Sequence, residues 1–488
     1  MKIALDLQGI QSEASRTRGI GRYSYEVVRN ILSINSSHDF ILVANGALED
    51  LRYLFKDQLE KENISYYEWF APCPLDYISK NQSIYEIALL LRSYAIGLLD
   101  VDIFIITSFL EGFSNNCLTE VNLEICQTKV ISIFYDLIPL LNPQLYLDSN
   151  PIFSSFYRKK IHGLKKLDAL LAISESSANE VINYLGIDSN KVFNISSACD
   201  KNIFNSIPDN NNLSLENNYK FNPYILYTGA HDPRKNLYNL LKAYSYLPSD
   251  IKRKYKLILA GKIINREEEL LDKWIIEFSI DITQVIKLGY ISDQELVDLY
   301  RNCSLFVFPS LHEGFGLPVL EAMSCGAPVI GSNLTSIPEV IGCKEAMFDP
   351  TNAYEMSDLI EKSLVDCGFR DKLLKNGHIQ SEKFSWNQTA RNVLEACENI
   401  IADDQIKSSN ISWQFNLDRI KYMRNDLIDK IFIYLDSINS YSFDLINLIA
   451  SCIDLINTQS ELLIRSDIKS RSITSWRVEG PFDSSYSL

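Results

Sequence analysis

The sequence predicts an α/β protein with two doubly wound, Rossmann-like domains and a helical extension at its C-terminal end. Three observations lead to this fold class. Short apolar runs alternate with longer amphipathic stretches, the alternation stops at a polar segment near the middle and then restarts, and the pattern becomes purely helical beyond Ala402. A length of 488 residues also exceeds what one ordinary hydrophobic core holds, so we expect more than one domain.

The first domain is predicted to span residues 1–207. Its apolar runs are nearly unbroken, which is typical of parallel strands buried on both faces. Helical patterns at Tyr23–Leu32 and Ile84–Leu99 lie between them, and strand–helix alternation of this kind favours a doubly wound sheet. The predicted strands are Lys2–Leu7, Phe40–Ala44, Asp102–Thr107, Val130–Tyr135, Ala169–Ile173 and Val192–Ile195.

A second α/β domain is predicted at residues 223–385. The segment before it, from Pro208 to Asn222, is rich in Asn and buries little, so it is interpreted as a linker. After the domain, a helix at Asn387–Ile401 is expected to pack back across the linker as a crossover helix, residues 386–402. The predicted strands are Tyr224–Thr228, Lys256–Ala260, Val285–Leu288, Leu305–Phe308 and Pro328–Gly331.

The remaining residues are predicted to form an appended region. Ile and Leu at helical spacing between Trp413 and Leu463 indicate two or three helices within residues 403–475. Residues 476–488 have the pattern of a strand that enters a loop. They are interpreted as the start of a further module, with a simple tail as the alternative.

Composition limits the functional classes. The formal net charge of -15 argues against nucleic-acid binding, which depends on Lys and Arg. The ten cysteines include no CxxC pair and the five histidines no HExxH motif, so no built-in metal site is expected. The richest apolar stretch, Phe443 to Ile456, is interrupted by Asp444 and Asp454 and is too short to span a membrane. No secretory signal pattern follows Met1, so a cytoplasmic location is expected.

The strongest chemical motif runs from Glu313 to Glu321 and follows the predicted strand Leu305–Phe308. Glycines at 314 and 316 allow a tight turn with accessible N–H groups, and Pro318 suits the first turn of a helix. The N-terminus of such a helix attracts a phosphate. Glu313 can reach a sugar above the loop, whereas Glu321, on the helix, can accept hydrogen bonds from ribose hydroxyls. The alternative is that Glu321 is merely exposed on a helix face and that the glycines merely form a turn.

A second motif, from Gly229 to Leu237, directly follows the strand Tyr224–Thr228. Loops at the carboxyl ends of parallel strands bind ligands in α/β sheets. Arg234 and Lys235 provide two neighbouring cations there, which suit a pyrophosphate leaving group. Taken alone, such a pair is usually plain surface charge; the combination with the glutamate motif is what favours a binding site.

Together these motifs resemble the family 4 glycosyltransferases of GT-B fold, particularly those that add mannose to bacterial polysaccharides. The family's E-x7-E motif falls on Glu313 and Glu321, and its Pro-Arg-Lys-Asn motif on Pro233 to Asn236. The resemblance covers roughly residues 1 to 400. Further matches are Arg18 to Tyr23, Asp136 to Pro139, Ile173 to Glu175, Leu288 to Tyr290 and Phe348 to Pro350.

The resemblance implies a role for each matching residue. The N-terminal domain would hold the acceptor and the C-terminal domain the nucleotide sugar, across a cleft. Arg234 and Lys235 would bind the diphosphate, and Glu313 would hold the donor sugar. Tyr135 and Asp136 would face the reacting sugar. The first loop, with Gly19, Gly21 and Arg22, would shape the phosphate and acceptor side. The remaining donor-site residues would be Gly229, Gly289, Tyr290, Ile291, Gly314, Phe315, Gly316, Leu317 and Glu321.

Tyr135 departs from the family pattern, because many relatives have a histidine immediately before the Asp-Leu-Ile-Pro segment. A tyrosine is a poor general base at neutral pH, since its ordinary pKa is near 10. The resemblance implies a front-face, retaining mechanism in which the leaving phosphate helps to deprotonate the acceptor. Transfer therefore does not depend on a base at position 135.

The resemblance implies GDP-mannose as donor and a growing, lipid-linked surface glycan as acceptor, with no obligatory metal. It also implies peripheral association with the inner face of the cytoplasmic membrane and further glycosyltransferase modules on the same polypeptide. UDP-linked glucose or N-acetylglucosamine remains an alternative donor. The rival functions are a nucleotide-sugar epimerase of the same fold and a non-catalytic module that binds nucleotide sugar.

Overall fold

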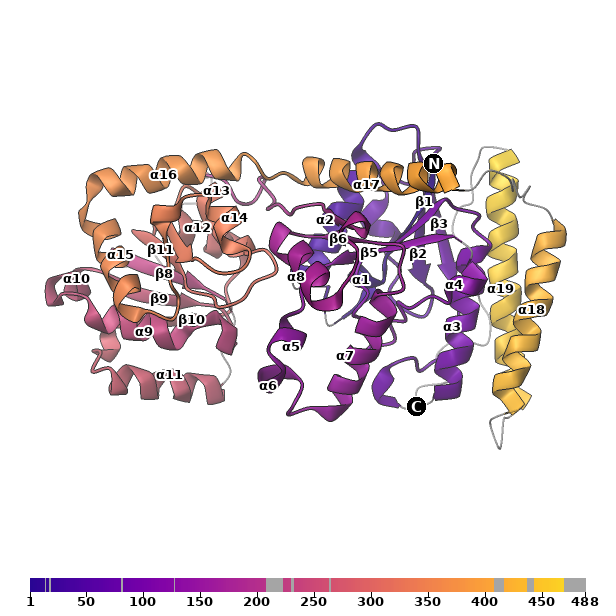
Figure 1. Ribbon diagram of the computed structural model, residues 1–488, viewed down its shortest axis with the longest axis horizontal. Helices are drawn as coiled ribbons and strands as arrows, with labels where there is room; N and C mark the ends of the chain where they lie inside the picture. The colour runs from indigo at the N-terminus through magenta and orange to yellow at the C-terminus, as the bar shows by residue number, and fades with distance from the viewer. Residues whose placement is uncertain are drawn as a thin grey trace.

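The computed structural model describes residues 1–207, 223–407, 417–436 and 443–468, apart from positions 14, 17, 18, 80, 81, 127, 230, 231, 263 and 264. The predicted linker at 208–222, Trp413 and the segment 476–488 lie outside the described residues. Figure 1 shows two α/β lobes side by side, with one long helix crossing above them and two helices at the far end.

The first lobe is built on a seven-stranded parallel sheet with the order β3-β2-β1-β4-β5-β6-β7. The order reverses between β1 and β4, where Ile3 pairs with Phe40 on one side and Ile103 on the other. The predicted doubly wound fold is therefore confirmed for this lobe. The strands are β1 (Lys2–Asp6), β2 (Asp39–Asn45), β3 (Ile64–Trp69), β4 (Ile103–Ile106), β5 (Lys129–Phe134), β6 (Ala169–Ala172) and β7 (Val192–Asn194).

Helices cover both faces of this sheet. Successive residues of a strand point to opposite faces, so Ile3 and Leu5 join one buried cluster whereas Ala4 joins the other. The first cluster contains the apolar face of α2 and the second that of α3. The helices are α1 (Gln8–Gln11), α2 (Gly19–Ser33), α3 (Gln82–Gly97), α4 (Leu123–Cys126), α5 (Ile138–Leu141), α6 (Pro143–Tyr146), α7 (Pro151–Leu164) and α8 (Glu175–Leu185), with short 3-10 turns at Arg52–Phe55, Tyr77–Ser79 and Ser189–Lys191.

The second lobe contains a six-stranded parallel sheet with the order β10-β9-β8-β11-β12-β13, which reverses between β8 and β11. Its strands are β8 (Tyr224–Thr228), β9 (Lys256–Ala260), β10 (Val285–Gly289), β11 (Leu305–Phe308), β12 (Val329–Ser332) and β13 (Met347–Phe348). Its helices are α9 (Leu237–Tyr246), α10 (Ser249–Lys254), α11 (Asn265–Glu277), α12 (Asp293–Asn302), α13 (Leu317–Ser324), α14 (Ile337–Ile341), α15 (Ala353–Val365) and α16 (Cys367–Ser381), with 3-10 turns at Pro233–Lys235, Ile282–Gln284 and Lys344–Ala346.

The crossover helix α17 (Trp386–Lys407) leaves the second lobe and returns to the first (Figure 1). It packs against α2, and the Trp386 ring meets the Tyr23 ring edge-on at 5.1 Å between centroids. The amide of Asn392 donates to the carbonyl of Ile195. The helix therefore ties the end of the second lobe to the first.

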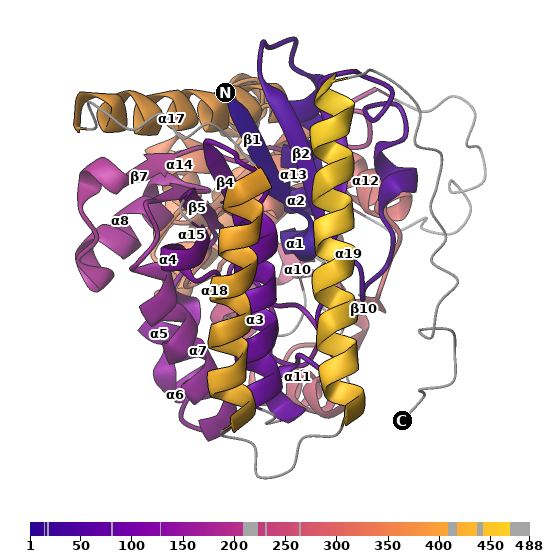
Figure 2. The same cartoon turned by 90° about the vertical axis from the view of Figure 1, so that its right-hand side faces the viewer.

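The appended helices α18 (Leu417–Asp436) and α19 (Phe443–Ile468) stand beside α3 and the edge strand β3 (Figure 2). Their buried residues, including Leu427, Ile431 and Ile456, join the core of the first lobe. The hydroxyls of Tyr67 on β3 and Ser460 on α19 are 3.2 Å apart. One face of each helix thus extends the core over the sheet edge. Within the described residues, no helix combines the length and the apolar character that crossing a bilayer requires.

Candidate active site

The loops that carry the two predicted motifs meet at the switch point of the second sheet. One loop follows β8 and the other follows β11, the adjacent strands between which the order reverses. Ligands bind beyond the carboxyl ends of strands at such points. A guanidinium nitrogen of Arg234 lies 2.9 Å from Glu313 Oε2, and Lys235 Nζ lies 2.6 Å from Glu313 Oε1. The structure therefore brings the three residues together as one charged cluster.

The Glu313 carboxylate is held ionised by this cluster. Burial acts to raise its pKa, but the charges of Lys235 and Arg234, with hydrogen bonds from Lys235 and Ser310, lower it to about 2. The Ser310 hydroxyl donates to Glu313 Oε1 over 2.6 Å. Burial is nearly complete, because only 9% of the Glu313 side chain is exposed. The Arg234 guanidinium also pairs with Asp232 over 3.4 Å, so the two cations of the cluster are balanced by two acidic side chains.

The loop after Glu313 leads directly into α13, with Gly316 as the N-terminal cap at a φ of 101°. Only glycine adopts this left-handed conformation without strain. Pro318 follows in the first turn, as predicted. The chain thereby turns sharply at the start of α13, where the positive end of the helix dipole favours an anion. Phe315 is buried beneath the turn.

Glu321 lies further along α13, half-buried beside Tyr300 and Arg22. Burial raises its pKa to about 7, against the lowering effects of a hydrogen bond from Tyr300 and the charge of Arg22. The Tyr300 hydroxyl donates to Glu321 Oε2 over 3.2 Å. The two glutamates of the motif therefore have opposite environments, since one is ionised throughout the neutral range and the other titrates within it.

The other residues predicted for the donor side border this region. Gly229 directly follows β8 with a φ of 151°, and a side chain there would come within 2.7 Å of the Tyr227 hydroxyl. Gly289 closes β10 with a φ of 70°, followed by Tyr290, which is 81% exposed. Ile291 is half-buried against the core. An exposed aromatic ring at the end of β10 leaves a surface on which a nucleobase can lie.

The side chains of Asp136 and Tyr135, which follow β5, point in different directions. A side chain at Gly314 would come within 3.3 Å of Asp136 Oδ2, so this carboxyl lies directly against the Gly314 turn. Burial raises its pKa, an effect that a backbone hydrogen bond from Ile138 and the charge of Arg234 oppose. Tyr135 instead directs its hydroxyl into the first lobe, 3.0 Å from the Thr107 carbonyl oxygen and from the Ser24 hydroxyl. Burial raises its pKa further above the ordinary value, which fits the expectation that it is no general base.

The prediction that Gly19 and Gly21 lie in a loop is wrong, because both belong to the first turn of α2. Glycine is needed at position 21 because the helix packs closely against the preceding chain, and not because the chain reverses there. A side chain at Gly21 would come within 2.4 Å of the Ser15 carbonyl oxygen, so the helix can begin only without one. Arg22, one residue on, pairs with Asp293 at the start of α12 over 3.1 Å and so links the two lobes.

Several residues that had no predicted role join the lobes around the cluster. The hydroxyls of Ser174 and Ser177 donate to the Gly314 carbonyl over 2.6 and 3.0 Å. The Glu339 carboxylate accepts hydrogen bonds from the N–H groups of Glu175 and Ser176 at the start of α8. These contacts join positions far apart in sequence; Ser174 and Glu175 belong to the matched segment Ile173 to Glu175, but that segment alone does not indicate which residues they contact.

A further contact between the lobes lies directly before Glu313. His312 Nε2 lies 2.7 Å from Glu180 Oε1, and its other ring nitrogen lies 3.3 Å from the Asn142 amide. On the opposite side the Tyr146 hydroxyl donates to Asp232 over 2.6 Å. In the sequence, the feature that could have pointed to a role for His312 is its position directly before the E-x7-E motif.

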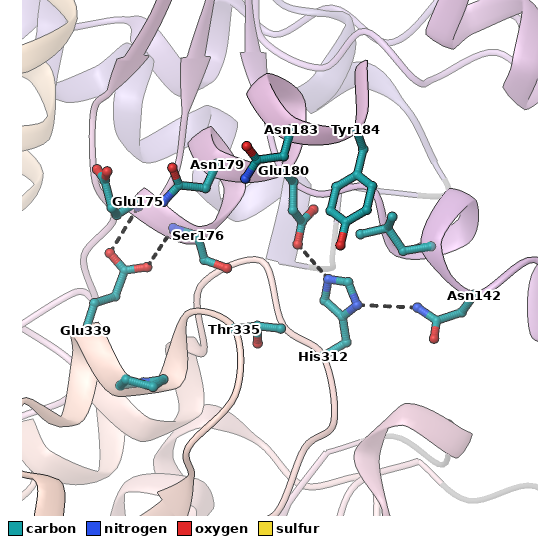
Figure 3. Close-up of a pocket in the computed structure, with 12 residues that line it drawn as sticks. Asn142, Glu175, Ser176, Asn179, Glu180, Asn183, Tyr184, His312, Thr335 and Glu339 are labelled. Carbon is teal, nitrogen blue, oxygen red and sulfur yellow. Dashed lines mark hydrogen bonds and ion pairs between the residues drawn. The ribbon is translucent and has the colours of Figure 1, made fainter. Parts of the chain in front are cut away.

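A pocket of ≈ 560 Å³ opens between the lobes next to this contact (Figure 3). Its walls come from α8, from Leu141 and Asn142, from the second-lobe residues His312 and Thr335, and from α14. In the part of the chain that the structure describes, no group of three or more His, Cys, Asp or Glu residues is placed to hold a metal ion.

Two facing Rossmann-like lobes, with a charged cluster at the switch point of the second, define a GT-B protein. The fold is shared with Anabaena HepE in complex with UDP and glucose, at a TM-score of 0.57 and 18% identity over 82% of this chain and 99% of that one. Sucrose-phosphate synthase from Thermosynechococcus elongatus matches at a TM-score of 0.59 and 18% identity, over 83% of this chain and 100% of that one.

Within this fold, residues 213–380 match the family model "Glycosyl transferases group 1", so the second lobe is a group 1 glycosyltransferase domain. The chain is 36% identical over 433 residues to the serotype-specific mannosyltransferase WbdA of Escherichia coli, across 87% of this chain and 51% of that protein. It is 34% identical to the Escherichia coli O-antigen chain mannosyltransferase B, across 49% of this chain and 63% of that protein. The chain thus spans about half the length of the WbdA relatives it matches.

Proposed function

We propose that this chain is a retaining, family 4 glycosyltransferase that moves mannose from GDP-mannose onto a polysaccharide. The observation that carries the proposal is the cluster of Arg234, Lys235 and Glu313 at the switch point of a group 1 glycosyltransferase domain. Mannose as the transferred sugar is supported by the similarity to two Escherichia coli mannosyltransferases. A polysaccharide acceptor is supported by the second of these, which acts on the O-antigen chain.

In the proposed complex, the diphosphate lies against Arg234, Lys235 and the first N–H groups of α13. Phosphate oxygens compete with Glu313 and Asp232 for the two cations. Glu313 thereby gains free lone pairs, with which it accepts hydrogen bonds from hydroxyls of the donor sugar. Glu321 accepts from the ribose, and Tyr290 borders the base.

The reaction breaks the bond between the anomeric carbon and the diphosphate oxygen. The acceptor hydroxyl oxygen forms its new bond on the same face, and its proton passes to the departing phosphate oxygen. Negative charge grows on the diphosphate as it leaves, and fixed cations and N–H groups stabilise that charge in the transition state. Because the protein supplies this charge, the proposal includes no obligatory metal ion. The contacts between the lobes exclude water from the site and limit hydrolysis of the donor.

The acceptor is proposed to be a lipid-linked glycan, met at the inner face of the cytoplasmic membrane by peripheral association. Further glycosyltransferase modules on the same polypeptide belong to the same proposal. Both statements rest on the bacterial polysaccharide relatives, whose sequences extend well beyond the matched region.

The test is the release of nucleoside diphosphate from GDP-mannose, UDP-glucose and UDP-N-acetylglucosamine, with α-mannosides as acceptors. We expect turnover with GDP-mannose alone, unchanged by EDTA, and an α-linked product by NMR. Arg234→Ala and Glu313→Ala should each lower kcat at least about 100-fold, the scale of losing one transition-state charge contact. The matched control is Glu345→Ala, which removes an exposed carboxylate paired with Lys372.

Other outcomes would change the proposal in defined ways. Turnover with a UDP-sugar alone would replace mannose as the transferred sugar. Inversion at the anomeric carbon would overturn the front-face mechanism. If Arg234→Ala and Glu313→Ala both bind nucleotide sugar as well as the parent protein does, the donor site lies elsewhere.

A further inference from the structure

The pocket beside the charged cluster has the lining of a carbohydrate site. From α8 it receives Asn179, Asn183 and Tyr184, all of them exposed to solvent. The two asparagines are four residues apart, so they lie on one face of the helix. Figure 3 shows Tyr184 on the same helix, directed toward His312 on the opposite wall. The volume of ≈ 560 Å³ lies within the range of about 300–1,000 Å³ common for small-molecule sites.

The chemistry of the lining favours a neutral, hydroxyl-rich ligand. Asparagine amides both donate and accept hydrogen bonds, as sugar hydroxyls do. The Tyr184 ring is 63% exposed and offers an apolar face against which the C–H side of a pyranose can pack. Among the described residues that line the pocket, none is Lys or Arg, whereas Glu175, Glu180 and Glu339 all contribute carboxyl groups. An anionic ligand would therefore meet repulsion here.

The pocket also adjoins the reacting residues. His312, on its wall, immediately precedes Glu313, and the Glu313 N–H donates to the Thr335 hydroxyl over 3.1 Å. The Glu313 side chain turns away from this wall toward Arg234 and Lys235. The same short segment thus presents the donor cluster on one side and the pocket on the other.

We propose that this pocket is the acceptor subsite and holds a sugar ring of a neutral glycan during transfer. The inference rests on the proposed function and specifies which surface recognises the acceptor. Asn179 and Asn183 bond the ring hydroxyls, and Tyr184 supports the ring from α8. Because the opposite wall belongs to the second lobe, the subsite is complete only when the lobes are in contact, which couples acceptor binding to the assembly of the donor site.

The test compares Asn183→Ala and Tyr184→Ala with the parent protein. Neither residue takes part in the contacts that join the lobes, so we expect both variants to fold with unchanged melting temperature. With an α-mannobioside acceptor, KM should rise at least about tenfold in each variant, the scale of losing one well-made contact of about 1.4 kcal/mol. Acceptor-free hydrolysis of GDP-mannose should be unchanged. Tyr184→Phe keeps the ring and should retain most of the affinity.

Matched controls are Tyr53→Ala, whose side chain is also 63% exposed, and Asn302→Ala on α12. Binding of the mannobioside is followed separately by saturation-transfer NMR, which requires no turnover. Loss of this signal in Tyr184→Ala supports the subsite even if GDP-mannose is not the donor. An unchanged signal and KM in both variants would overturn the inference and leave the proposed function standing. Competition by inorganic phosphate at the same site would also overturn it.

Discussion

At the scale of single residues, the E-x7-E motif consists of two glutamates with different electrostatic environments. Glu313 is surrounded by Arg234, Lys235 and Ser310, and its pKa is lowered to about 2. Glu321 has a hydroxyl partner, Tyr300, and burial raises its pKa to about 7. The sequence predicted that both residues would face the ligand. It could not predict this difference, because the partners of each carboxyl come from other strands and helices.

The raised pKa of Glu321 predicts a pH-dependent affinity for the donor. A ribose hydroxyl bonds the ionised carboxylate more strongly than the protonated acid, so binding should be weak at low pH, strengthen through pH 7 and level off above it. Below pH 7 the Kd of GDP-mannose should rise by up to about tenfold per pH unit. Titration calorimetry between pH 5.5 and 8.5 measures this, because the phosphates of a nucleotide sugar do not titrate in that range.

The control for this prediction is Glu321→Gln, which cannot ionise. Its Kd should be higher than that of the parent protein above pH 7 and nearly independent of pH. If the parent and the variant show the same pH profile, Glu321 does not carry the dependence and its assignment to the ribose is wrong.

At the scale of elements, the apolar runs were sufficient to predict, to within about a residue at each end, eleven of the thirteen strands in the part of the chain that the structure describes. The two missed strands lie at sheet edges. In β3, Ser65 and Glu68 interrupt the apolar pattern because the strand is only partly covered, and β13 is only two residues long. The helices α18 and α19 were predicted as helices, but their packing site was not, since an apolar stripe indicates burial without naming the partner.

The Gly314 turn is the element whose shape most directly affects the assembled site. A side chain there would come within 2.7 Å of the Tyr135 carbonyl oxygen, a backbone atom that cannot swing aside. Gly314→Ala should therefore push the turn away from β5 and weaken its bonds to Ser174 and Ser177. We expect kcat/KM for transfer to fall about 10- to 100-fold, in line with about 1–3 kcal/mol for an overpacked contact.

The matched control is Gly368→Ala near the start of α16, where the added methyl would meet the exposed Asp366 side chain and no other atom within 4 Å. Alanine also favours the helical conformation there. Activity at the parent level in Gly368→Ala and a loss in Gly314→Ala would locate the effect at the turn. Full activity in Gly314→Ala would show that the turn need not lie against β5 during transfer.

At the scale of the whole molecule, the candidate site is complete only where the two lobes touch, because Asp136 and the α8 wall of the pocket come from the first lobe. Contacts through Gly314, Glu339, His312, Asp232 and Asp293 surround the charged cluster and the pocket. Each is a polar contact rather than a large apolar surface. Interfaces of this kind separate and reform more readily than hydrophobic cores. We infer that the relative position of the lobes responds to single substitutions.

Removal of the Glu339 carboxylate should therefore shift the molecule toward an open arrangement. Glu339 accepts hydrogen bonds of 3.0 and 3.3 Å from the N–H groups of Glu175 and Ser176, where the dipole of α8 favours a negative charge. Losing this contact in Glu339→Ala should raise the free energy of the closed form relative to the open form by about 1–2 kcal/mol. This corresponds to about a 5- to 30-fold shift of the equilibrium toward the open form.

The two exposed cysteines allow this shift to be measured without new labelling sites. Cys73 lies in the first lobe and Cys367 at the start of α16 in the second, whereas the other eight cysteines are buried. Energy transfer between dyes on these two thiols should decrease in Glu339→Ala and be restored in part by GDP-mannose, the proposed donor. Glu345→Ala, which removes an exposed carboxylate within the second lobe, should leave it unchanged. Equal transfer efficiency in the parent protein and both variants would mean that contacts other than the hydrogen bonds to Glu339 hold the lobes together.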